Sequence, residues 1–295
     1  TLRPDPDLNR RRAEEWARRL EERRRAMSPE ELERLARETR ELEARTAAPN
    51  PPEALATLPR LSRADVPPEP RLIPTTVEMV GNSPLLRVET LTRGVVYLEL
   101  AADLAALPPQ DWVRLPALVE LWLNTGAGGR DHAEMASRES AVCAGLRGAV
   151  AASGTVEDPA RLRLCLTIAT YALEERLPAA LELLTDRLER PNFGDPRRIA
   201  TLLAERQSQL RDDVLHSGSA YAARRAARGF GPVRACEEAL SGIEQVRASR
   251  RWADTAEREG EAVGAEFEAL RRRVLGCARW HLAAAGSEAA IELLA

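Results

Sequence analysis

Hydrophobic residues follow two different periods along this chain, and the period changes from helical to strand-like near position 76. From Asp7 to about Ala47, apolar side chains such as Trp16, Leu20 and Met27 recur on one helical face. This three- to four-residue spacing predicts helices in the first part of the chain.

The sequence Ser28–Pro29–Glu30–Glu31 separates two such helices. Ser28 is a suitable N-cap, Pro29 suits the first helical position and Glu31 completes a capping box. Leu35 and Leu42 then recur at heptad spacing. We therefore predict an α-helical hairpin that acts as a linker over residues 1–47.

Prolines dominate the next segment, residues 48–76, which we predict to be an extended connector, because each proline removes a hydrogen-bond donor and fixes its own φ. They are Pro49, Pro51, Pro52, Pro59, Pro67, Pro68, Pro70 and Pro74.

Strand-like alternation begins at Val77 and is clearest after Gly94, where Val96, Leu98 and Leu100 alternate with more polar neighbours. This period of two predicts a strand with one buried face. The turn Thr92–Arg93–Gly94 predicts a hairpin that joins this strand to the one before it.

Further elements follow in the order helix, helix, strand pair, long helical block and last strand. They are expected from Pro116 to Asn124, from Asp131 to Gly145, at 146–155 and 161–173, from Glu174 to Leu275 and at 277–284, with a short helix after Ser287. The sequence thus predicts an α+β domain over residues 77–295, with two layers and with helices packed on one face of a mostly antiparallel sheet.

Composition narrows the possible partners. The chain has 295 residues, 44% of them hydrophobic, and a formal net charge of −3. Its arginine clusters at 10–12 and 23–25 are interleaved with glutamate, which favours a solvated helix over a nucleic-acid interface. No apolar run reaches the length of a bilayer span. We therefore expect neither a nucleic-acid nor a membrane partner.

The four cysteines are scattered and lack metal or redox spacing, which favours free thiols in a reducing compartment. They are Cys143, Cys165, Cys236 and Cys277. With a charged N-terminal region and no signal peptide, a cytoplasmic location is expected. The abrupt ends of the sequence suggest a piece of a longer protein.

None of the three histidines, His132, His216 and His281, has a second histidine at zinc-motif spacing. His132 and Glu134 match half of a deaminase motif, but the thiolate pair that would complete it is missing. We therefore predict no metal site and no bound cofactor in this chain.

Catalytic constellations are also absent from the sequence. The glycines 126, 128 and 129 precede a helix, but without the Lys-Ser/Thr of a P-loop they are interpreted as a turn. Ser153, Ser217 and Ser219 lack a nucleophile elbow. Tyr221, Arg224 and Arg225 follow a flexible stretch and either face a cavity or lie on a helix surface. No catalytic or cofactor-binding residue is predicted.

Four stretches, taken in order, resemble one known family. They are LATLPRLSRADVPPEP (Leu55–Pro70), TLTRGVVYLELAADLAALPP (Thr90–Pro109), LNTGAGGRDHAEM (Leu123–Met135) and SGSAYAARRAARGF (Ser217–Phe230). Together they resemble the pitrilysin/insulinase-type inverzincin metallopeptidases, and within them the presequence protease branch. Arg93 stands where that branch usually has Asn.

The resemblance implies an inter-half linker followed by the third of four related domains. In that family the zinc ligands and the catalytic glutamate belong to the first domain, and the substrate-contacting Arg and Tyr belong to the last. No catalytic residue of the family therefore carries over to this sequence, and zinc is expected only in the parent catalytic domain.

The resulting hypothesis is a non-catalytic segment of a zinc-dependent oligopeptidase that forms part of a chamber enclosing unfolded peptides. Its partner would be the catalytic half of the same peptidase or a catalytic subunit. The alternatives are a separate inactive subunit, and a stand-alone interaction or scaffold protein that recruits partners through its helical hairpin.

Overall fold

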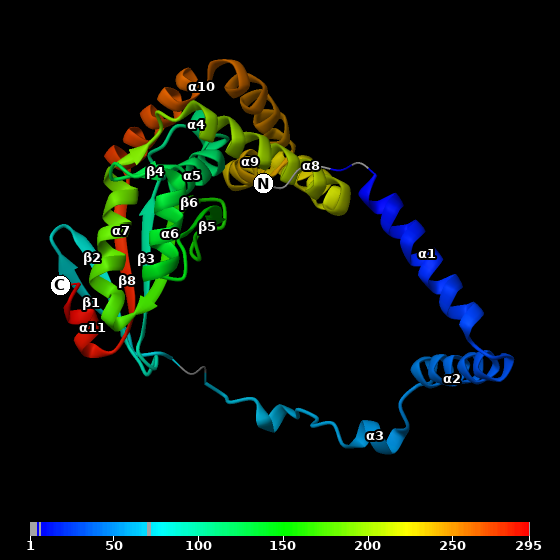
Figure 1. Ribbon diagram of the computed structural model, residues 1–295. Coiled ribbons are helices and arrows are strands. Elements are labelled where there is room, and N and C mark those ends of the chain that lie inside the picture. The colour runs from blue at the N-terminus through cyan, green and yellow to red at the C-terminus, as the bar shows by residue number, and fades with distance from the viewer. Residues whose placement is uncertain (1–4, 6, 70–71, 295) are drawn as a thin grey trace. The chain divides into compact units, whose positions relative to one another are not determined.

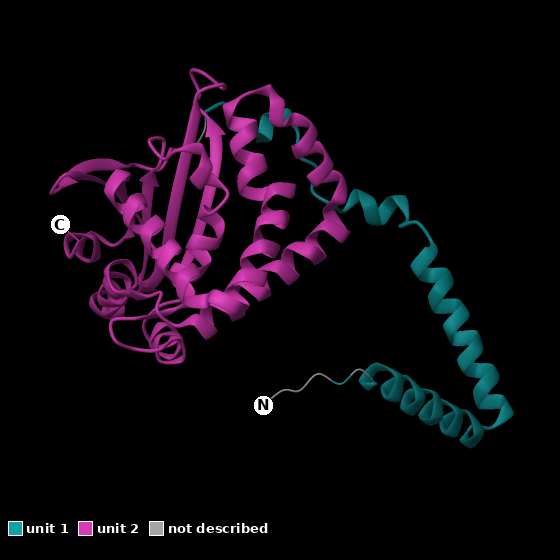
Figure 2. Ribbon diagram, turned by 90° about the horizontal axis from the view of Figure 1, so that it is seen from above, with its two compact units in different colours: residues 1–71 teal, residues 72–295 magenta. Residues whose placement is uncertain are grey.

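A computed structural model describes residues 5, 7–69 and 72–294 of the chain. The chain divides into two compact units, Thr1–Arg71 and Leu72–Ala295 (Figure 2). Each unit is described by itself below.

Unit 1 contains two long helices that start and stop where the sequence predicts. They are α1 (Leu8–Ala26) and α2 (Pro29–Ala47), followed by the short α3 (Pro52–Ala56) and a 3₁₀ turn at Arg63–Asp65. The Ser28 hydroxyl accepts a hydrogen bond from the Glu31 backbone N–H, and the Glu31 carboxylate accepts one from the Ser28 N–H at 2.8 Å. Local capping chemistry therefore determines the break between the two helices.

Neither α1 nor α2 has a buried residue. The apolar side chains Trp16, Leu20, Leu35 and Leu42 are all exposed. The contacts that support these helices are therefore local: the capping box at the start of α2 and ion pairs between successive turns, such as Arg19 with Glu15 in α1. Their pairing as a hairpin remains a prediction.

Unit 2 is built on a six-stranded sheet in the order β1-β2-β8-β3-β6-β5 (Figure 1). The strands are β1 (Thr76–Val80), β2 (Ser83–Glu89), β3 (Val95–Asp103), β5 (Arg147–Gly154), β6 (Leu162–Leu173) and β8 (Arg279–Gly286). In this sheet the β2–β8 pair is parallel, and each of the other pairs of neighbouring strands is antiparallel. The predicted mostly antiparallel sheet is confirmed.

The predicted hairpin between β2 and β3 is wrong. The last strand, β8, lies between them and pairs with both, so that Leu282 is opposite Leu85 on one side and Leu100 on the other. The turn before Gly94 therefore spans the width of one strand. Alternation along β2 and β3 shows which face is buried, but it contains no information about which strand becomes the neighbour.

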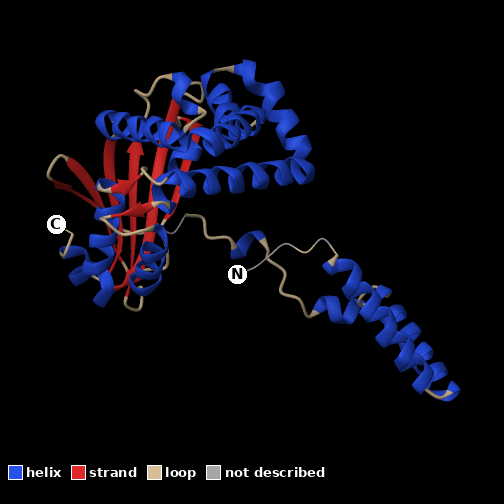
Figure 3. Ribbon diagram, turned by 45° about the horizontal axis from the view of Figure 1, so that its top comes forward, coloured by secondary structure: helices blue, strands red, loops and turns tan. Residues whose placement is uncertain are grey.

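Helices cover one face of this sheet (Figure 3, helices blue and strands red). The helices are α4 (Pro109–Trp112), α5 (Leu115–Asn124), α6 (His132–Val142), α7 (Leu177–Glu189), α8 (Pro196–Ala227), α9 (Pro232–Ser241), α10 (Ile243–Cys277) and α11 (Glu288–Glu292). A two-residue pair, β4 (Gly126–Ala127) with β7 (Pro191–Asn192), links the loops before α6 and α8.

The main core lies between the helices and the sheet, with Trp122 and Leu118 of α5 and Ile168 of β6 all buried. The indole N–H of Trp122 donates a 2.7 Å hydrogen bond to the Arg187 carbonyl, which satisfies its one polar atom. At Gly148 of β5, an added Cβ would lie 2.3 Å from the Val119 side chain. Close contact between α5 and the sheet therefore requires glycine there.

Candidate functional site

One face of the six-stranded sheet is not covered by the helices of unit 2. In β3, the side chains of Val96 and Leu98 point into the core, so those of Tyr97 and Glu99 point the other way. By register, Tyr97 is opposite Tyr171 of β6. We call this outward side of β1, β2, β8, β3, β6 and β5 the open face.

The open face is unusually apolar for a sheet surface in contact with water. It carries five of the exposed large hydrophobic side chains, namely Val77, Met79, Tyr97, Tyr171 and Leu173. An antiparallel sheet with one solvated face normally alternates apolar residues inside with polar residues outside. Several large apolar side chains exposed on one face of a sheet favour an interaction site there.

A hollow of about 320 Å³ lies on this face between the two tyrosines and Arg147. The rings of Tyr97 and Tyr171 have centroids 5.5 Å apart, and the Arg147 guanidinium lies 5.7 Å from the centre of the Tyr171 ring. We call this space the tyrosine hollow. Its floor is made largely of the outward-facing alanines Ala169, Ala283 and Ala285. Small floor residues beside the paired rings leave room for a side chain from outside.

A second hollow of about 290 Å³ lies further along the same face, and Glu99 lines both. Its polar lining includes Asp103, Arg163, Cys165 and His281. Burial raises the pKa of the Cys165 thiol, so this cysteine is a poor nucleophile at neutral pH.

The three histidines lie on separate elements. His132 is the first residue of α6, His216 lies on α8 with its Nδ1 2.8 Å from the Asp212 carbonyl oxygen, and His281 lies on β8. In the part of the chain that the structure describes, no group of three or more His, Cys, Asp or Glu side chains is placed to hold a metal ion.

The glycine-rich turn before α6 is a structural turn. The Asp131 carboxylate accepts hydrogen bonds of 2.8 Å from the backbone N–H groups of Ala133 and Glu134, which lowers the pKa of Asp131. The Gly128 N–H donates to the Arg190 carbonyl. Most of the backbone donors that could hold an anion there, including those of Gly128, Asp131, Ala133 and Glu134, are thus already used.

Tyr221, Arg224 and Arg225 form contacts within the helical layer. The Tyr221 hydroxyl donates a 2.7 Å hydrogen bond to Asp213 across the kink of α8 at Ser217. Arg225 pairs with Glu244 of α10 at 2.8 Å. These residues therefore stabilise the bent helix α8 and its contact with α10.

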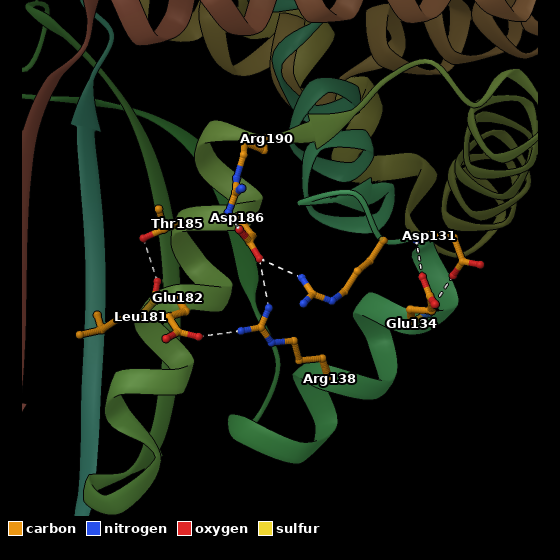
Figure 4. A network of polar contacts seen from close by, with 9 residues as sticks. Asp131, Glu134, Arg138, Leu181, Glu182, Thr185, Asp186 and Arg190 are labelled. Carbon is orange, nitrogen blue, oxygen red and sulfur yellow. Dashed lines mark hydrogen bonds and ion pairs between the residues drawn. The ribbon is translucent and has the colours of Figure 1, made fainter.

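An arginine cluster around Asp186 of α7 was not predicted from the sequence (Figure 4). The Asp186 side chain is only 5% exposed and accepts from Arg138 of α6 at 3.1 Å, from Arg130 at 3.4 Å and from Arg190. The sequence signal was weak, since only the i,i+4 spacing of Asp186 and Arg190 is local. We call this the Asp186 cluster; it connects α6 and the preceding turn to α7.

Gly128 is required by the same cluster. Its φ is +58°, and an added Cβ would lie 2.7 Å from the Asp186 carboxylate. The turn therefore needs glycine both for its backbone conformation and for the close approach of Asp186.

Fold and face together define an α+β domain with an apolar interaction surface on its sheet and no catalytic group that the geometry assembles among the described residues. The sequence model of a family of peptidase-associated domains, those associated with subfamily C of the M16 peptidases, matches residues 2–251, and the chain belongs to that family.

Curated relatives of the chain support the same family assignment. The chain is 27% identical over 197 residues to the mitochondrial presequence protease of Danio rerio, covering 67% of this chain and 19% of that protein. It is 23% identical over 279 residues to presequence protease 1, chloroplastic/mitochondrial, of Arabidopsis thaliana, covering 94% of this chain and 26% of the relative. The chain thus spans only about a fifth to a quarter of these relatives, and its resemblance to the presequence protease branch is confirmed.

Among solved structures, a conserved protein from Enterococcus faecalis V583 has the same fold, with a TM-score of 0.53 and 12% identity over 73% of this chain and 49% of that one. In the described part of the chain, no helix is both long and apolar enough to cross a membrane.

Proposed function

We propose that this chain is the non-catalytic part of a zinc-dependent oligopeptidase of the presequence protease type. In this proposal, residues 1–47 link two halves, residues 48–76 connect them to the next domain, and residues 77–295 form part of the chamber that encloses unfolded peptides. The catalytic half of the same peptidase supplies the zinc ion.

The apolar open face is the observation that carries this proposal. In a domain that functions alone in water, an exposed sheet face bearing Val77, Met79 and Leu173 would favour aggregation. A wall of a chamber requires a surface of this kind, because unfolded peptides present both apolar side chains and backbone. The four free cysteines fit a reducing compartment, in which we place the protein, in the cytoplasm.

The experiment is reconstitution of a cleaving enzyme from two pieces. The purified chain is mixed with a zinc-loaded catalytic half from a presequence protease, and cleavage of a quenched fluorescent peptide library is followed. We expect no turnover from this chain alone, turnover from the mixture, and loss of that turnover with a chelator.

Two outcomes would contradict the proposal. Chelator-sensitive turnover by the isolated chain with one bound zinc would make it a catalytic domain. Stable binding to the catalytic half with no gain in turnover would instead favour a separate inactive subunit or a scaffold protein.

A further inference from the structure

The tyrosine hollow on the open face has the shape and chemistry of an anchor for one side chain. Its volume of about 320 Å³ is at the low end of ligand pockets. Tyr97 and Tyr171, whose rings pack against each other, provide one aromatic wall, and alanines leave the floor beside it empty. We infer that this hollow anchors a large apolar or aromatic side chain of an extended peptide. This inference rests on the function proposed above.

Charges on the face favour a peptide over a permanently docked domain. Glu99 and Arg147 are exposed within it, and neither forms an ion pair with another residue that the structure describes. A rigid domain covering them would have to bury both charges, which is strongly unfavourable unless it supplies a partner for each. An extended peptide can cross the face while both charged groups stay hydrated or contact its backbone.

The two hollows are spaced for a single extended strand. Along β3, the tyrosine hollow spans Tyr97–Glu99 and the second spans Glu99–Asp103. Same-side side chains of an extended peptide recur about every 7 Å, so a stretch of about seven residues running along β3 spans both hollows. The peptide would place its apolar side chain against the paired tyrosine rings, over the alanine floor, and a polar one near Asp103 and His281.

The test measures binding by the full chain. The probes are two fluorescein-labelled peptides of about twelve residues in a Gly/Ser background, one with a single central Phe and the other with Ala there. Fluorescence anisotropy gives the dissociation constant of each. We expect the unmodified chain to bind the Phe peptide about tenfold more tightly than the Ala peptide.

Three variants locate the anchor. In Tyr97→Ala and Tyr171→Ala the preference for Phe should fall to about twofold or less. Tyr97→Phe keeps the ring and should retain the preference. Val156→Ala removes a 94% exposed apolar side chain from the β5–β6 turn, away from the tyrosine hollow, and serves as the matched control. Unchanged thermal unfolding of each variant excludes misfolding.

An unchanged Phe preference in both tyrosine-to-alanine variants would overturn the inference. The inference would also be overturned if the catalytic half displaced the Phe peptide completely and no cleavage occurred. In that case a domain, rather than a peptide, would occupy the open face. The reconstitution experiment separates the two proposals. If Tyr97→Ala and the unmodified chain restore turnover with the same KM, the anchor fails and the chamber function stands. If no catalytic half restores turnover while the Phe preference holds, the anchor stands and the chamber function fails.

Discussion

At the scale of single residues, Arg93 adopts a backbone conformation that its side chain disfavours. Its φ is +54°, and it alone among the described non-glycine residues has a positive φ. A left-handed conformation costs an L-residue about 1–2 kcal/mol, and Asn tolerates it better than Arg. The sequence comparison identified Arg93 as a departure from the usual Asn, and the structure gives the physical meaning of that departure.

Arg93→Asn should therefore raise the free energy of unfolding by about 0.5–1 kcal/mol. Urea titration measures this change. The control is Arg161→Asn, which removes the same charge from an exposed position that has no positive φ. Equal effects of the two substitutions would show that lost charge, rather than relieved strain, is responsible.

Tyr221 should make stability depend on alkaline pH. Burial, and then the hydrogen bond to Asp213, raise the pKa of Tyr221 to about 12, against about 10 for an unperturbed tyrosine. Because the folded-state pKa is the higher one, the protonated phenol stabilises the fold fully below about pH 10. This contribution is lost as the pH rises through about 12.

Tyr221→Phe should lower the free energy of unfolding by about 1–2 kcal/mol at pH 8, because the hydrogen bond to a charged group is lost. The difference in the free energy of unfolding between the unmodified chain and Tyr221→Phe should become smaller between pH 10 and pH 12. Urea titrations at three pH values measure it. A gap that stays constant over this interval would contradict the assignment.

At the scale of elements, local chemistry determines where helices begin. The capping box of Ser28 with Glu31 and the helix start at Asp131 were both predicted correctly, and the structure shows a capping box of Asp131 with Glu134. Caps involve residues within one turn of each other, so the sequence contains all the information they need. Contacts between elements, such as the Asp186 cluster, join residues far apart in sequence and were missed.

Removing the central carboxylate of that cluster should separate α6 from α7. Asp186→Ala leaves the guanidinium groups of Arg130, Arg138 and Arg190 without their shared partner, and we expect a loss of about 2–3 kcal/mol in the free energy of unfolding. Chemical denaturation of Asp186→Ala, Arg138→Ala and the double variant measures the coupling between them.

Glu182→Ala is the control for this prediction. Glu182 also pairs with Arg138, at 2.9 Å, but its side chain is 72% exposed. Exposed pairs contribute little, so we expect a loss below about 0.5 kcal/mol. A similar loss for Asp186→Ala would show that the cluster is only a surface feature.

At the scale of the whole molecule, the last strand determines whether unit 2 folds. β8 hydrogen-bonds to β2 on one side and β3 on the other, and Ala284 and Ile291 complete a core cluster with Leu85 and Val96. A chain that ends at Ala278 would leave β1 and β2 unpaired with the rest of the sheet and would expose that cluster.

We therefore expect the chain truncated at Ala278 to lose its cooperative thermal transition and to bind a hydrophobic dye. Deletion of residues 1–47 serves as the control. Those residues belong to the other compact unit and bury no side chain of α1 or α2, so their loss should leave the main transition unchanged. Cooperative unfolding of the chain without β8 would contradict this account of the sheet.

By itself, the sequence determined the fold class, the approximate bounds of the first two helices and of most strands, the cap at Ser28 and the family, because each depends on short-range periodicity, local hydrogen bonding or the order of motifs. It did not divide the predicted helical block from Glu174 to Leu275, which the structure separates into α7, α8, α9 and α10. Tertiary structure alone decided that β8 separates β2 from β3, that three arginines converge on Asp186, and that Tyr97 and Tyr171 form a hollow. The place of β8 and the tyrosine hollow depend on strand order and register, which bring residues more than seventy positions apart into contact, as with Tyr97 and Tyr171. The Asp186 cluster depends on the packing of α6 against α7. Many strand orders bury the same alternating side chains, and only the complete core selects one of them.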